Sequence, residues 1–457
     1  MNLFTTADRR PVHFVGIGGA GMSALALIAC RRGLAVSGCD TDATGAADLA
    51  ALGVPVLQGH DPSHVDGARA VVVTAAVAAG HPELDRARAL GLPVVPRKVA
   101  LAALIGEARS VAVAGTHGKT TTTVMATEAL TAAGLAPTGI AGGRVQAWGG
   151  NALLAGDDLF VVEADEYDQA FLALHPTVAI VNNVEPDHLE CYGSMAALED
   201  AFAEFAGRAE VAVMSADDAG ARLVAGRLGR TPRRFGFAAD ADIRIDGMIQ
   251  HADRTDASVH FPGRRTLAVR LRVPGVHNLR NAVAALGAVD ALEGDLARAA
   301  AALAEFGGVG RRFERLGEHR GVAVVDDYAH HPSELVATLA AARQAYPGRR
   351  LVAVFQPHLY SRTAAHGQAM GEALAAADLV LVTEIYAARE QPVAGVSGRQ
   401  VADAARRAGA DARFEPTRAD VGRRVFEALV PGDVVLTLGA GDITRVGPEL
   451  VRWLDPA

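Results

Sequence analysis

The stretch Val111-Ala-Val-Ala-Gly-Thr-His-Gly-Lys-Thr-Thr-Thr-Thr123 contains the pattern that decides the fold. A short apolar run leads into a glycine-containing loop, Gly115 to Thr121, and then into an expected helix. Loops of the pattern G-x-x-x-x-G-K-[ST] wrap backbone N–H groups around nucleotide phosphates, and their lysine meets the charge of the β- and γ-phosphates. Val113 stands where that pattern has its first glycine, so this loop is a shortened variant. The stretch predicts a strand, a phosphate loop and a helix, and it implies ATP or GTP.

Lysine is scarce in this chain, and the scarcity strengthens that interpretation. Of 44 lysines and arginines, only Lys98 and Lys119 are lysines. A lysine in a turn between strand and helix is common in proteins, but this one stands in the frame of a phosphate loop. Thr120 beside it can place its hydroxyl on Mg²⁺. We expect the nucleotide phosphates to be held by Gly115, Thr116, His117, Gly118, Lys119, Thr120 and Thr121.

A second glycine loop lies near the N-terminus, in Val12-His-Phe-Val-Gly-Ile-Gly-Gly-Ala-Gly-Met-Ser23. Gly16, Gly18 and Gly21 match G-x-G-x-x-G, so backbone N–H groups can approach a diphosphate at a helix N-terminus. Asp40 follows the next apolar run, near the place of a ribose-binding acid. The pattern indicates a diphosphate nucleotide such as NAD, FAD or a UDP-sugar. The alternative is a tight turn that only packs a strand against a helix.

The pair of loops is more informative than either loop alone. A nicotinamide dehydrogenase leaves the phosphate loop unexplained, and a GTPase switch has no need of the first loop. Two nucleotide sites on successive domains suggest that one nucleotide supplies the energy of a reaction. The other would then be the part of a substrate by which the protein binds it. A regulatory protein that keeps the fold without the chemistry is a further alternative, which intact Lys119, Glu163 and His188 disfavour.

Composition limits the class of protein. The net charge is −8 and the pI is about 6.0, whereas nucleic-acid binders are usually basic. The sequence has no basic start followed by an apolar stretch and a cleavage site, and no apolar run of about 18 residues. We therefore expect a cytoplasmic protein without a membrane span. Cys30, Cys39 and Cys191 have no CxxC spacing, so the spacing predicts neither a disulfide framework nor a zinc site.

Short apolar runs alternate with longer helical stretches along the whole chain. The runs are continuous, as expected of parallel strands covered on both faces, so the predicted fold class is α/β. Three domains are predicted, at residues 1–106, 107–315 and 316–457, and a polar region at Asp242–Val273 is expected to be β-like. The predicted strands include Val12–Ile17, Ala35–Cys39, Val71–Thr74, Val111–Ala114, Leu159–Ala164, Val178–Asn182, Val322–Asp326, Leu351–Phe355, Leu379–Val382 and Val434–Leu438.

Acidic side chains follow two predicted strands downstream of the phosphate loop. Phe160–Asp168 places Glu163 at a strand end, and the segment after the next strand offers Glu185, Asp187 and His188. Mg²⁺ prefers oxygen ligands together with phosphate and water, so Glu163 is the expected ligand. Helix caps or solvated turns are the alternative.

Polar residues also follow strands in the last third of the chain. Val324–Glu334 combines two acids, a tyrosine and two histidines, and Phe355–Arg362 follows the next strand. Ligands of open α/β sheets bind at the carboxyl ends of the strands. Asn278 and Asn281 share one face of a predicted helix, where amides can read a purine edge. In both regions an ordinary capping role is the alternative.

Taken together, these motifs resemble the Mur ligase family. They occur in family order and cover almost the whole chain. The segments that carry the resemblance are HFVGIGGAGMS, AGTHGKTTTT, VVEADEYD, NNVEPDHLECYG, HNLRNA, GVGRRFE, DDYAHHPSE and FQPHLYSRT.

The resemblance implies an N-terminal Rossmann-like UDP-binding domain, a central P-loop ATPase domain and a C-terminal Rossmann-like domain that binds an amino acid. It implies an ATP- and Mg²⁺-dependent ligase of peptidoglycan synthesis, acting as a monomer or homodimer. The implied reaction adds L-alanine to the carboxylate of UDP-N-acetylmuramate through an acyl phosphate. The alternative within the family is attachment of a preformed peptide to the same sugar.

The resemblance also implies roles by position. The UDP-sugar is expected at Gly16, Gly18, Gly19, Gly21, Met22, Ser23 and Asp40. The metal is expected at Thr120, Glu163 and His188. Beyond the phosphate loop, ATP is expected at His277, Asn278, Asn281, Arg312 and Asp326. The amino acid is expected at Tyr328, His358 and Arg362, and catalysis is expected from Lys119, Arg362, His330 and His331, either histidine being a candidate base.

The sequence departs from the family pattern at three positions. Tyr167 stands where many members have serine, and DEYD also resembles murein peptide ligase. Leu359 stands where arginine is frequent, so Arg362 is the expected partner of the amino-acid carboxylate. His81 replaces a common asparagine.

The phosphate-loop assignment gives the first testable prediction. Lys119→Ala should abolish ADP release, because the charge that builds on the phosphoryl oxygens loses its nearest cation. Binding of the UDP-sugar at the other loop should remain largely intact. Steady-state ADP release and equilibrium binding of the UDP-sugar measure the two effects. Normal turnover of the variant would rule out the assignment.

Overall fold

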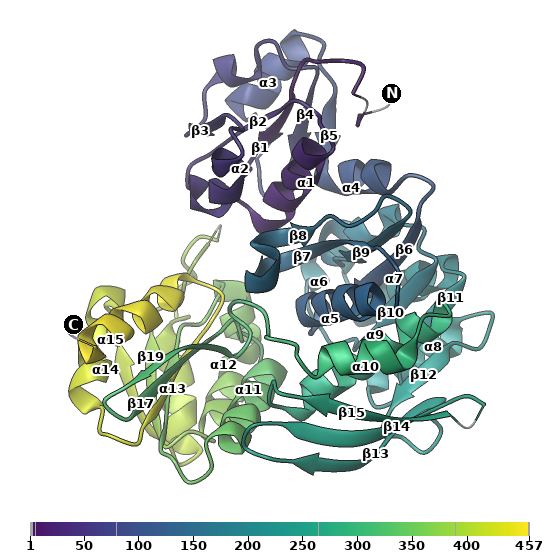
Figure 1. Ribbon diagram of the computed structural model, residues 1–457. Helices are drawn as coiled ribbons and strands as arrows, with labels where there is room; N and C mark the ends of the chain where they lie inside the picture. The colour runs from purple at the N-terminus through teal and green to yellow at the C-terminus, as the bar shows by residue number, and fades with distance from the viewer. Residues whose placement is uncertain (1–2, 5, 79, 264, 389, 456–457) are drawn as a thin grey trace. The chain divides into compact units, whose positions relative to one another are not determined.

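The computed structural model describes residues 3–4, 6–78, 80–263, 265–388 and 390–455 (Figure 1). The chain separates into two compact units. The first comprises Met1–Met248, Ala257–Arg270 and Arg280–Phe306, and the second comprises Ile249–Asp256, Leu271–Leu279 and Gly307–Ala457. No helix in the described part of the chain has both the length and the apolar character to cross a membrane.

The N-terminal part of the first unit is built on a five-stranded parallel sheet of order β3-β2-β1-β4-β5. Continuous apolar runs form its central strands, as the fully buried β1 shows. Its elements are β1 (Val12–Val15), α1 (Ala20–Arg31), β2 (Val36–Asp40), η1 (Ala43–Ala46), α2 (Ala47–Ala51), β3 (Val56–Gln58), η2 (Pro62–Val65), β4 (Ala70–Val73), α3 (Pro82–Ala89), β5 (Val94–Pro96) and α4 (Arg97–Ile105).

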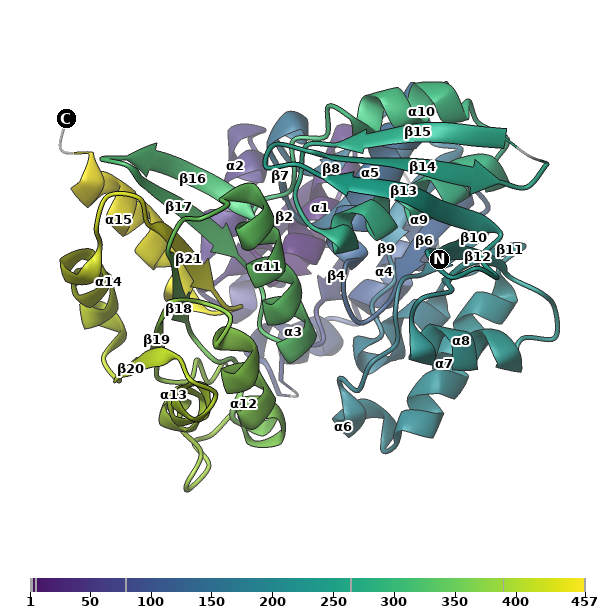
Figure 2. The same cartoon turned by 90° about the horizontal axis from the view of Figure 1, so that it is seen from below.

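The central region forms a ten-stranded sheet of order β15-β14-β13-β12-β11-β10-β6-β9-β7-β8. Strand β6 lies between β10 and β9 and is parallel to both, so their carboxyl ends meet at one edge. The region contains β6 (Arg109–Ala114), α5 (Lys119–Ala132), β7 (Thr138–Val145), η3 (Gln146–Trp148), β8 (Gly150–Leu153), β9 (Leu159–Glu163), η4 (Tyr167–Ala173), β10 (Val178–Val181), α6 (Leu189–Tyr192), α7 (Met195–Arg208), β11 (Val211–Ser215), α8 (Ala219–Arg227), β12 (Arg233–Gly236), β13 (Ile243–Gln250), β14 (Thr255–Phe261), β15 (Arg265–Leu271), α9 (Val276–Ala291) and α10 (Leu296–Leu303). Strands β13, β14 and β15 lie side by side in Figure 2.

The C-terminal part forms a six-stranded sheet of order β16-β17-β21-β18-β19-β20, in which only the β16–β17 pair is antiparallel among the described residues. Its elements are β16 (Glu314–His319), β17 (Val322–Asp327), α11 (Pro332–Ala345), β18 (Leu351–Phe355), α12 (Tyr360–Leu374), β19 (Leu379–Thr383), α13 (Gly398–Arg407), β20 (Asp411–Glu415), α14 (Arg418–Ala428), β21 (Val434–Leu438), η5 (Asp442–Arg445) and α15 (Val446–Leu454).

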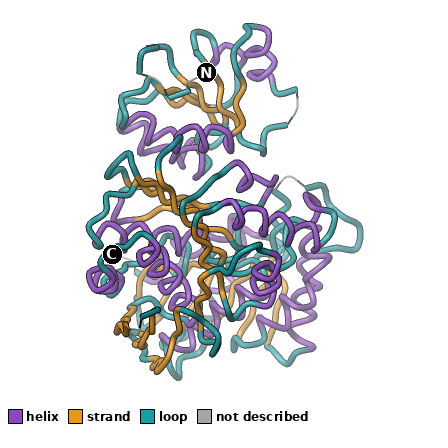
Figure 3. The backbone as a smooth tube through the Cα atoms, turned by 90° about the vertical axis from the view of Figure 1, so that its right-hand side faces the viewer, coloured by secondary structure: helices purple, strands orange, loops and turns teal. Residues whose placement is uncertain are grey.

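The sheets of the N- and C-terminal parts have apolar cores on both faces. In the N-terminal sheet, Phe14 packs into a core with α1, whereas Val15 on the opposite face packs with Leu84 of α3. In the C-terminal sheet one core involves α11, α12 and α13, and the other involves α14 and α15. Figure 3 shows the orange strands flanked by purple helices. Burial on both faces explains why the strand sequences are continuously apolar.

The predicted α/β fold class is confirmed, and each of the ten predicted strands overlaps a strand of the structure. The β-like region at Asp242–Val273 forms β13, β14 and β15. The strands that were not among the predicted ones are β3, β5, β7, β8, β11, β12, β16 and β20. Short polar segments such as Glu314–His319 carry little apolar signal because only part of their surface is buried.

Candidate functional site

The phosphate loop runs from the end of β6 to the start of α5. Gly115 has a φ of 135° and Gly118 has a φ of 80°, both in the region that favours glycine. A Cβ atom on Gly118 would lie 2.8 Å from Oδ1 of Asn281, so a side chain there would also clash. The loop therefore keeps its backbone open at the N-terminus of α5, where N–H groups and the helix dipole favour phosphate.

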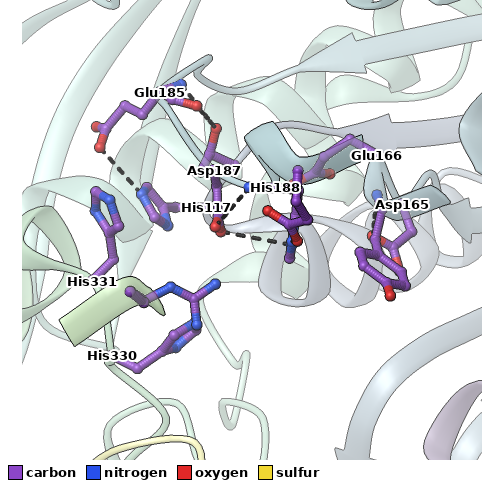
Figure 4. Close-up of polar contacts among 12 residues, drawn as sticks. His117, Asp165, Glu166, Glu185, Asp187, His188, His330 and His331 are labelled. Atoms are coloured by element: carbon purple, nitrogen blue, oxygen red, sulfur yellow. Dashed lines mark hydrogen bonds and ion pairs between the residues drawn. The ribbon is translucent and has the colours of Figure 1, made fainter. Parts of the chain in front are cut away.

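The segment after β10 fixes the shape of this loop. The N–H of Thr116 donates to the carbonyl of Asn183 at 3.2 Å, and that of His117 donates to Oδ1 of the same residue at 2.7 Å. The N–H of Glu185 donates to the hydroxyl of Thr116 at 2.8 Å. Nε2 of His117 lies 3.3 Å from the carboxylate of Glu185, as Figure 4 shows. Glu185 and Asn183 thus brace the loop.

Lys119 is held by a carboxylate that the sequence analysis did not single out. Its ammonium nitrogen lies 2.8 Å from both carboxylate oxygens of Glu166 and 2.6 Å from the carbonyl of Gly115. Glu166 is 2% exposed. It stands in the acidic motif after β9, where the sequence offered several acids and no means of choosing among them.

Burial and charge oppose each other in this pair. Burial disfavours the charge of Lys119, but the nearby carboxylates of Glu166, Asp165 and Glu163 outweigh it and raise the pKa of the lysine. Burial raises the pKa of Glu166, and the charge of Lys119 counteracts that rise. The ammonium therefore stays charged and ready for an anion.

Two of the three expected metal ligands follow the strands on either side of β6, and the third lies at the start of α5. Glu163 ends β9, where its carboxylate accepts a hydrogen bond from the N–H of Gly142. His188 follows β10 with a φ of 53°, and its ring lies 5.1 Å from that of Tyr167 and 3.7 Å from the carboxylate of Asp187 (Figure 4). Thr120 is in the first turn of α5 and is 6% exposed. Their metal binding stays a prediction.

The N-terminal glycine loop is ordered by backbone contacts and by Asp40. The N–H groups of Gly16 and Ile17 donate to the carbonyl of Cys39 at 2.9 and 3.1 Å. Oδ2 of Asp40 accepts from the N–H of Gly18 at 2.9 Å. A Cβ on Gly18 would lie 2.3 Å from the carbonyl oxygen of Asp42, so only glycine fits. Asp40 therefore shapes the loop, and a contact with ribose stays a prediction.

The start of α1 carries the remaining residues predicted to bind the UDP-sugar. Gly19 is the N-cap of the helix, and Met22 is buried. The hydroxyl of Ser23 donates to the carbonyl of Gly19 at 3.1 Å. A Cβ on Gly21 would lie 2.9 Å from the guanidinium of Arg97, which the sequence analysis missed. Arg97 places a positive charge beside the diphosphate loop.

In the second unit, five predicted residues lie in a chain of aromatic and basic contacts. The guanidinium of Arg312 lies 5.0 Å from the ring centroid of Tyr328. The Tyr328 ring meets that of His330 at 5.2 Å, which in turn meets His358 at 5.9 Å. Nη1 of Arg362 lies 3.2 Å from Nδ1 of His358. Basic and aromatic groups with this spacing suit a carboxylate-bearing ligand.

Asp326 and His331, two further predicted residues of this unit, and the neighbouring Asp327 make contacts within the unit, and the roles predicted for the first two stay predictions. The carboxylate of Asp326 accepts from the hydroxyls of Thr437 at 2.5 Å and Thr444 at 2.8 Å. Burial raises the pKa of Asp327 to about 6, against the charge of Arg312. His331 is the N-cap of α11, where its Nδ1 lies 2.9 Å from the Ser333 hydroxyl.

The residues predicted to meet the nucleotide from α9 have distinct surroundings. His277 lies in the first turn, and Asn278 donates to the carbonyl of Pro274 at 2.7 Å. Asn281 approaches Gly118 of the phosphate loop. Their contacts with ATP stay predictions.

Glu166→Gln tests the pairing of Lys119. Glutamine keeps the shape of the Glu166 side chain but removes the negative charge that pairs with Lys119. The melting temperature of the protein without nucleotide should therefore fall. Removing one partner costs about 3–5 kcal/mol in a fully buried pair, and less here because the Lys119 side chain is 16% exposed. Since phosphate replaces the lost charge, ATP should raise the melting temperature more in the variant than in the original protein. Thermal denaturation with and without ATP measures the difference.

Glu204→Gln is the matched control, because Glu204 is a half-exposed partner of Arg208 one turn along α7. Its stability should change by less than about 0.5 kcal/mol. An ATP-induced shift of equal size in Glu166→Gln and the original protein would show that this carboxylate does not compete with phosphate.

Three family descriptions match successive parts of the chain. Residues 11–109 match "Mur ligase family, catalytic domain", residues 113–289 match "Mur ligase middle domain", and residues 311–441 match "Mur ligase, glutamate ligase domain". Curated relatives from Burkholderia pseudomallei and Burkholderia mallei, named UDP-N-acetylmuramate–L-alanine ligase, are 43% identical over 455 residues. The alignment covers 96% of this chain and 97% of each relative.

Solved structures give the same result. The UDP-N-acetylmuramate–alanine ligase of Thermotoga maritima matches with a TM-score of 0.85 and 31% identity, covering 97% of this chain and 99% of the other. A murein peptide ligase from Psychrobacter arcticus matches with a TM-score of 0.74 and 25% identity, covering 97% and 98%. By motifs, fold and similarity over almost its full length, the chain belongs to the Mur ligase family.

Proposed function

We propose that this chain is an ATP-dependent ligase that adds L-alanine to the carboxylate of UDP-N-acetylmuramate, giving ADP and phosphate in peptidoglycan synthesis. The curated relatives at 43% identity carry the name of this activity. The observation that carries the proposal is Lys119. A charged lysine stands at the N-terminus of α5 in a braced phosphate loop, on a chain that also has a diphosphate-type loop.

The first step activates the acid. A carboxylate oxygen is a poor leaving group, so the sugar carboxylate attacks the γ-phosphate of ATP, and ADP leaves. The ammonium of Lys119 exchanges Glu166 for the phosphoryl oxygens and neutralises the charge that builds on them. Gly115 to Thr121 supply the surrounding N–H and hydroxyl groups.

The residues around the loop fit Mg²⁺. The carboxylate of Glu163 and the hydroxyl of Thr120 are hard oxygen donors, and Mg²⁺ completes its shell with phosphate and water. His188 is the third proposed ligand, following the neighbouring strand. The ion would supply positive charge beside the transferred phosphoryl group.

The second step forms the amide. The amino group of L-alanine attacks the acyl phosphate, phosphate leaves, and a base takes the proton of the amine. His330 is placed for this role by the contact of its Nδ1 with the carbonyl of Tyr328 at 3.0 Å, and His331 is the alternative base. Arg362 is the proposed partner of the amino-acid carboxylate, with His358 beside it. Tyr328 completes this amino-acid site.

Leu359 cannot make the contact that arginine would make at its position, because its side chain is apolar. It has a φ of 68° and is the N-cap residue of α12, so the backbone turns sharply before Arg362. We therefore assign the contact with the amino-acid carboxylate to Arg362 and not to position 359.

The remaining assignments follow from the proposed reaction. The UDP-sugar binds the domain at residues 1–106, ATP binds the domain at 107–315 with Arg312 and α9, and the amino acid binds the domain at 316–457. ATP and UDP-sugars are cytoplasmic metabolites, which is why we place the protein in the cytoplasm. We propose no larger assembly than a homodimer.

The decisive assay measures ADP release with UDP-N-acetylmuramate and Mg²⁺ while the amino acid is varied. L-Alanine should support turnover best, and each ADP should be matched by one amide product. The preformed cell-wall tripeptide, offered side by side, should support little release. Preferential use of the tripeptide would assign the chain to the murein peptide ligase activity, and absence of amide product with every amine would overturn the proposal.

A further inference from the structure

Six potential metal ligands gather on one face of the N-terminal sheet, and none of their side chains has a role in the proposed reaction. Two of them lie on strands, and the other four lie on the loops and short helices that cover this face. They come from β1, β2, the region of η2, and the start of α3: His13, Cys39, His60, His64, His81 and Glu83. Imidazole, thiol and carboxylate together are the donor set of transition-metal sites.

Glu83 is at the centre of this cluster and is fully buried. Its Oε1 accepts hydrogen bonds from Nδ1 of His64 at 2.8 Å and from the N–H of Asp61 at 3.2 Å. Its Oε2 lies 3.4 Å from Nδ1 of His60 and 3.9 Å from Nδ1 of His81. One oxygen is thus anchored, and the other is directed to imidazole nitrogens. A buried carboxylate of this kind requires a compensating positive charge.

Three donor atoms lie close to the spacing of a zinc coordination shell: two of their three separations match it, and the sulfur–oxygen separation is shorter because the thiol donates a hydrogen bond to the carboxylate. The sulfur of Cys39 lies 3.0 Å from either oxygen of Glu83 and 3.4 Å from Nδ1 of His60. The third edge, from His60 to Oε2 of Glu83, is 3.4 Å. With Zn–S near 2.3 Å and Zn–N or Zn–O near 2.0–2.1 Å, the edges of a tetrahedron are about 3.3–3.6 Å.

His13 supplies an independent observation. It is fully buried, its Nδ1 lies 3.0 Å from the Ser37 hydroxyl, and its Nε2 makes no hydrogen bond with any described residue. One of its ring nitrogens lies within 4.8 Å of the ligand atoms of Cys39 and Glu83. A hydrogen bond at one nitrogen typically orients a histidine that binds metal through the other. A buried imidazole nitrogen without a partner beside a thiol and a carboxylate therefore points to a ligand.

We propose that Cys39, Glu83, His60 and His13 bind one Zn²⁺-class ion. Thiolate and imidazole ligands favour such an ion over Mg²⁺ and Ca²⁺, which prefer oxygen. The Cys39 thiol, which donates to Glu83 without metal, gives up its proton when the metal–sulfur bond forms, so each bound ion releases one proton. His64 orients Glu83, and His81 lies next to the open oxygen.

The ion has a structural consequence for the neighbouring loop. The carbonyl of Cys39 accepts the N–H groups of Gly16 and Ile17, which begin the glycine loop. A metal bound to the side chain of Cys39 would connect β1 and β2 to α3. It would thereby fix the end of β2 that positions the glycine loop. We expect bound metal to raise the melting temperature of the full-length chain.

Cobalt reports directly on the proposed sulfur ligand. The purified full-length chain, freed of metal by chelation, is titrated with Co²⁺ and its absorption is recorded. The proposal predicts saturation at one equivalent with a sulfur-to-cobalt charge-transfer band, and displacement of that band by Zn²⁺. Absence of the band in the original protein overturns the proposal without reference to any variant.

Variants locate the site. Cys39→Ser should remove the band, and Glu83→Gln should remove the rise in melting temperature caused by Zn²⁺. Cys30→Ser, on α1 and outside the cluster, is the matched control and should keep both signals. If Cys39→Ser does not fold, as judged by circular dichroism, His60→Asn at a partly exposed position should instead weaken Co²⁺ binding by at least about tenfold. A band that survives Cys39→Ser, or unchanged binding in His60→Asn, would contradict the assignment.

Discussion

The charge of Lys119 is the constraint on which the central site depends. A largely enclosed ammonium must have a counter-charge, because burial without one is costly. Glu166 and the carbonyl of Gly115 surround it. A nucleotide has to offer more negative charge than this carboxylate, and a triphosphate does. The same pairing keeps the lysine protonated and positioned before the nucleotide arrives.

The rest of the site holds this charge where the reaction needs it. Glycines at positions 115 and 118 permit the loop its backbone, and Asn183 and Glu185 fix its shape from the neighbouring strand. Because β9 and β10 flank β6 in parallel, the acids after them reach the same edge of the sheet. The N-terminal sheet applies the same principle to a different loop, which Asp40 orders. Parallel strands thus bring residues far apart in sequence to common edges.

The sequence predicted those parts that have a local signature. Continuous apolar runs located all ten predicted strands, and the frame around Lys119 located the phosphate loop. Glu166 was missed because the sequence does not distinguish the acids of the motif after β9. Only the backbone conformation shows which of them is directed toward Lys119. Arg97 was missed because its approach to Gly21 depends on how α4 meets the glycine loop. The hydrogen bonds of Thr437 and Thr444 to Asp326 are long-range pairings that no local pattern encodes, and the contact of Asp326 with ATP stays a prediction.

The proposed metal cluster shows the same limit. Cysteine spacing predicted no zinc site, since the proposed ligands are dispersed over two strands, a loop and a helix. Only the register that sets Val15 opposite Cys39, with His13 two residues earlier on the same face, brings them together. Short-range spacing rules detect sites built from one loop and overlook sites assembled by a sheet.

The central claim is that the chain uses a triphosphate to convert an inert carboxylate into a phosphorylated one. The most direct measurement follows a heavy oxygen isotope placed in the carboxylate of UDP-N-acetylmuramate. If that carboxylate attacks the γ-phosphate, one labelled oxygen appears in the inorganic phosphate for each amide bond formed. Amide product accompanied by unlabelled phosphate would show that the acid was never phosphorylated, and the account would be wrong.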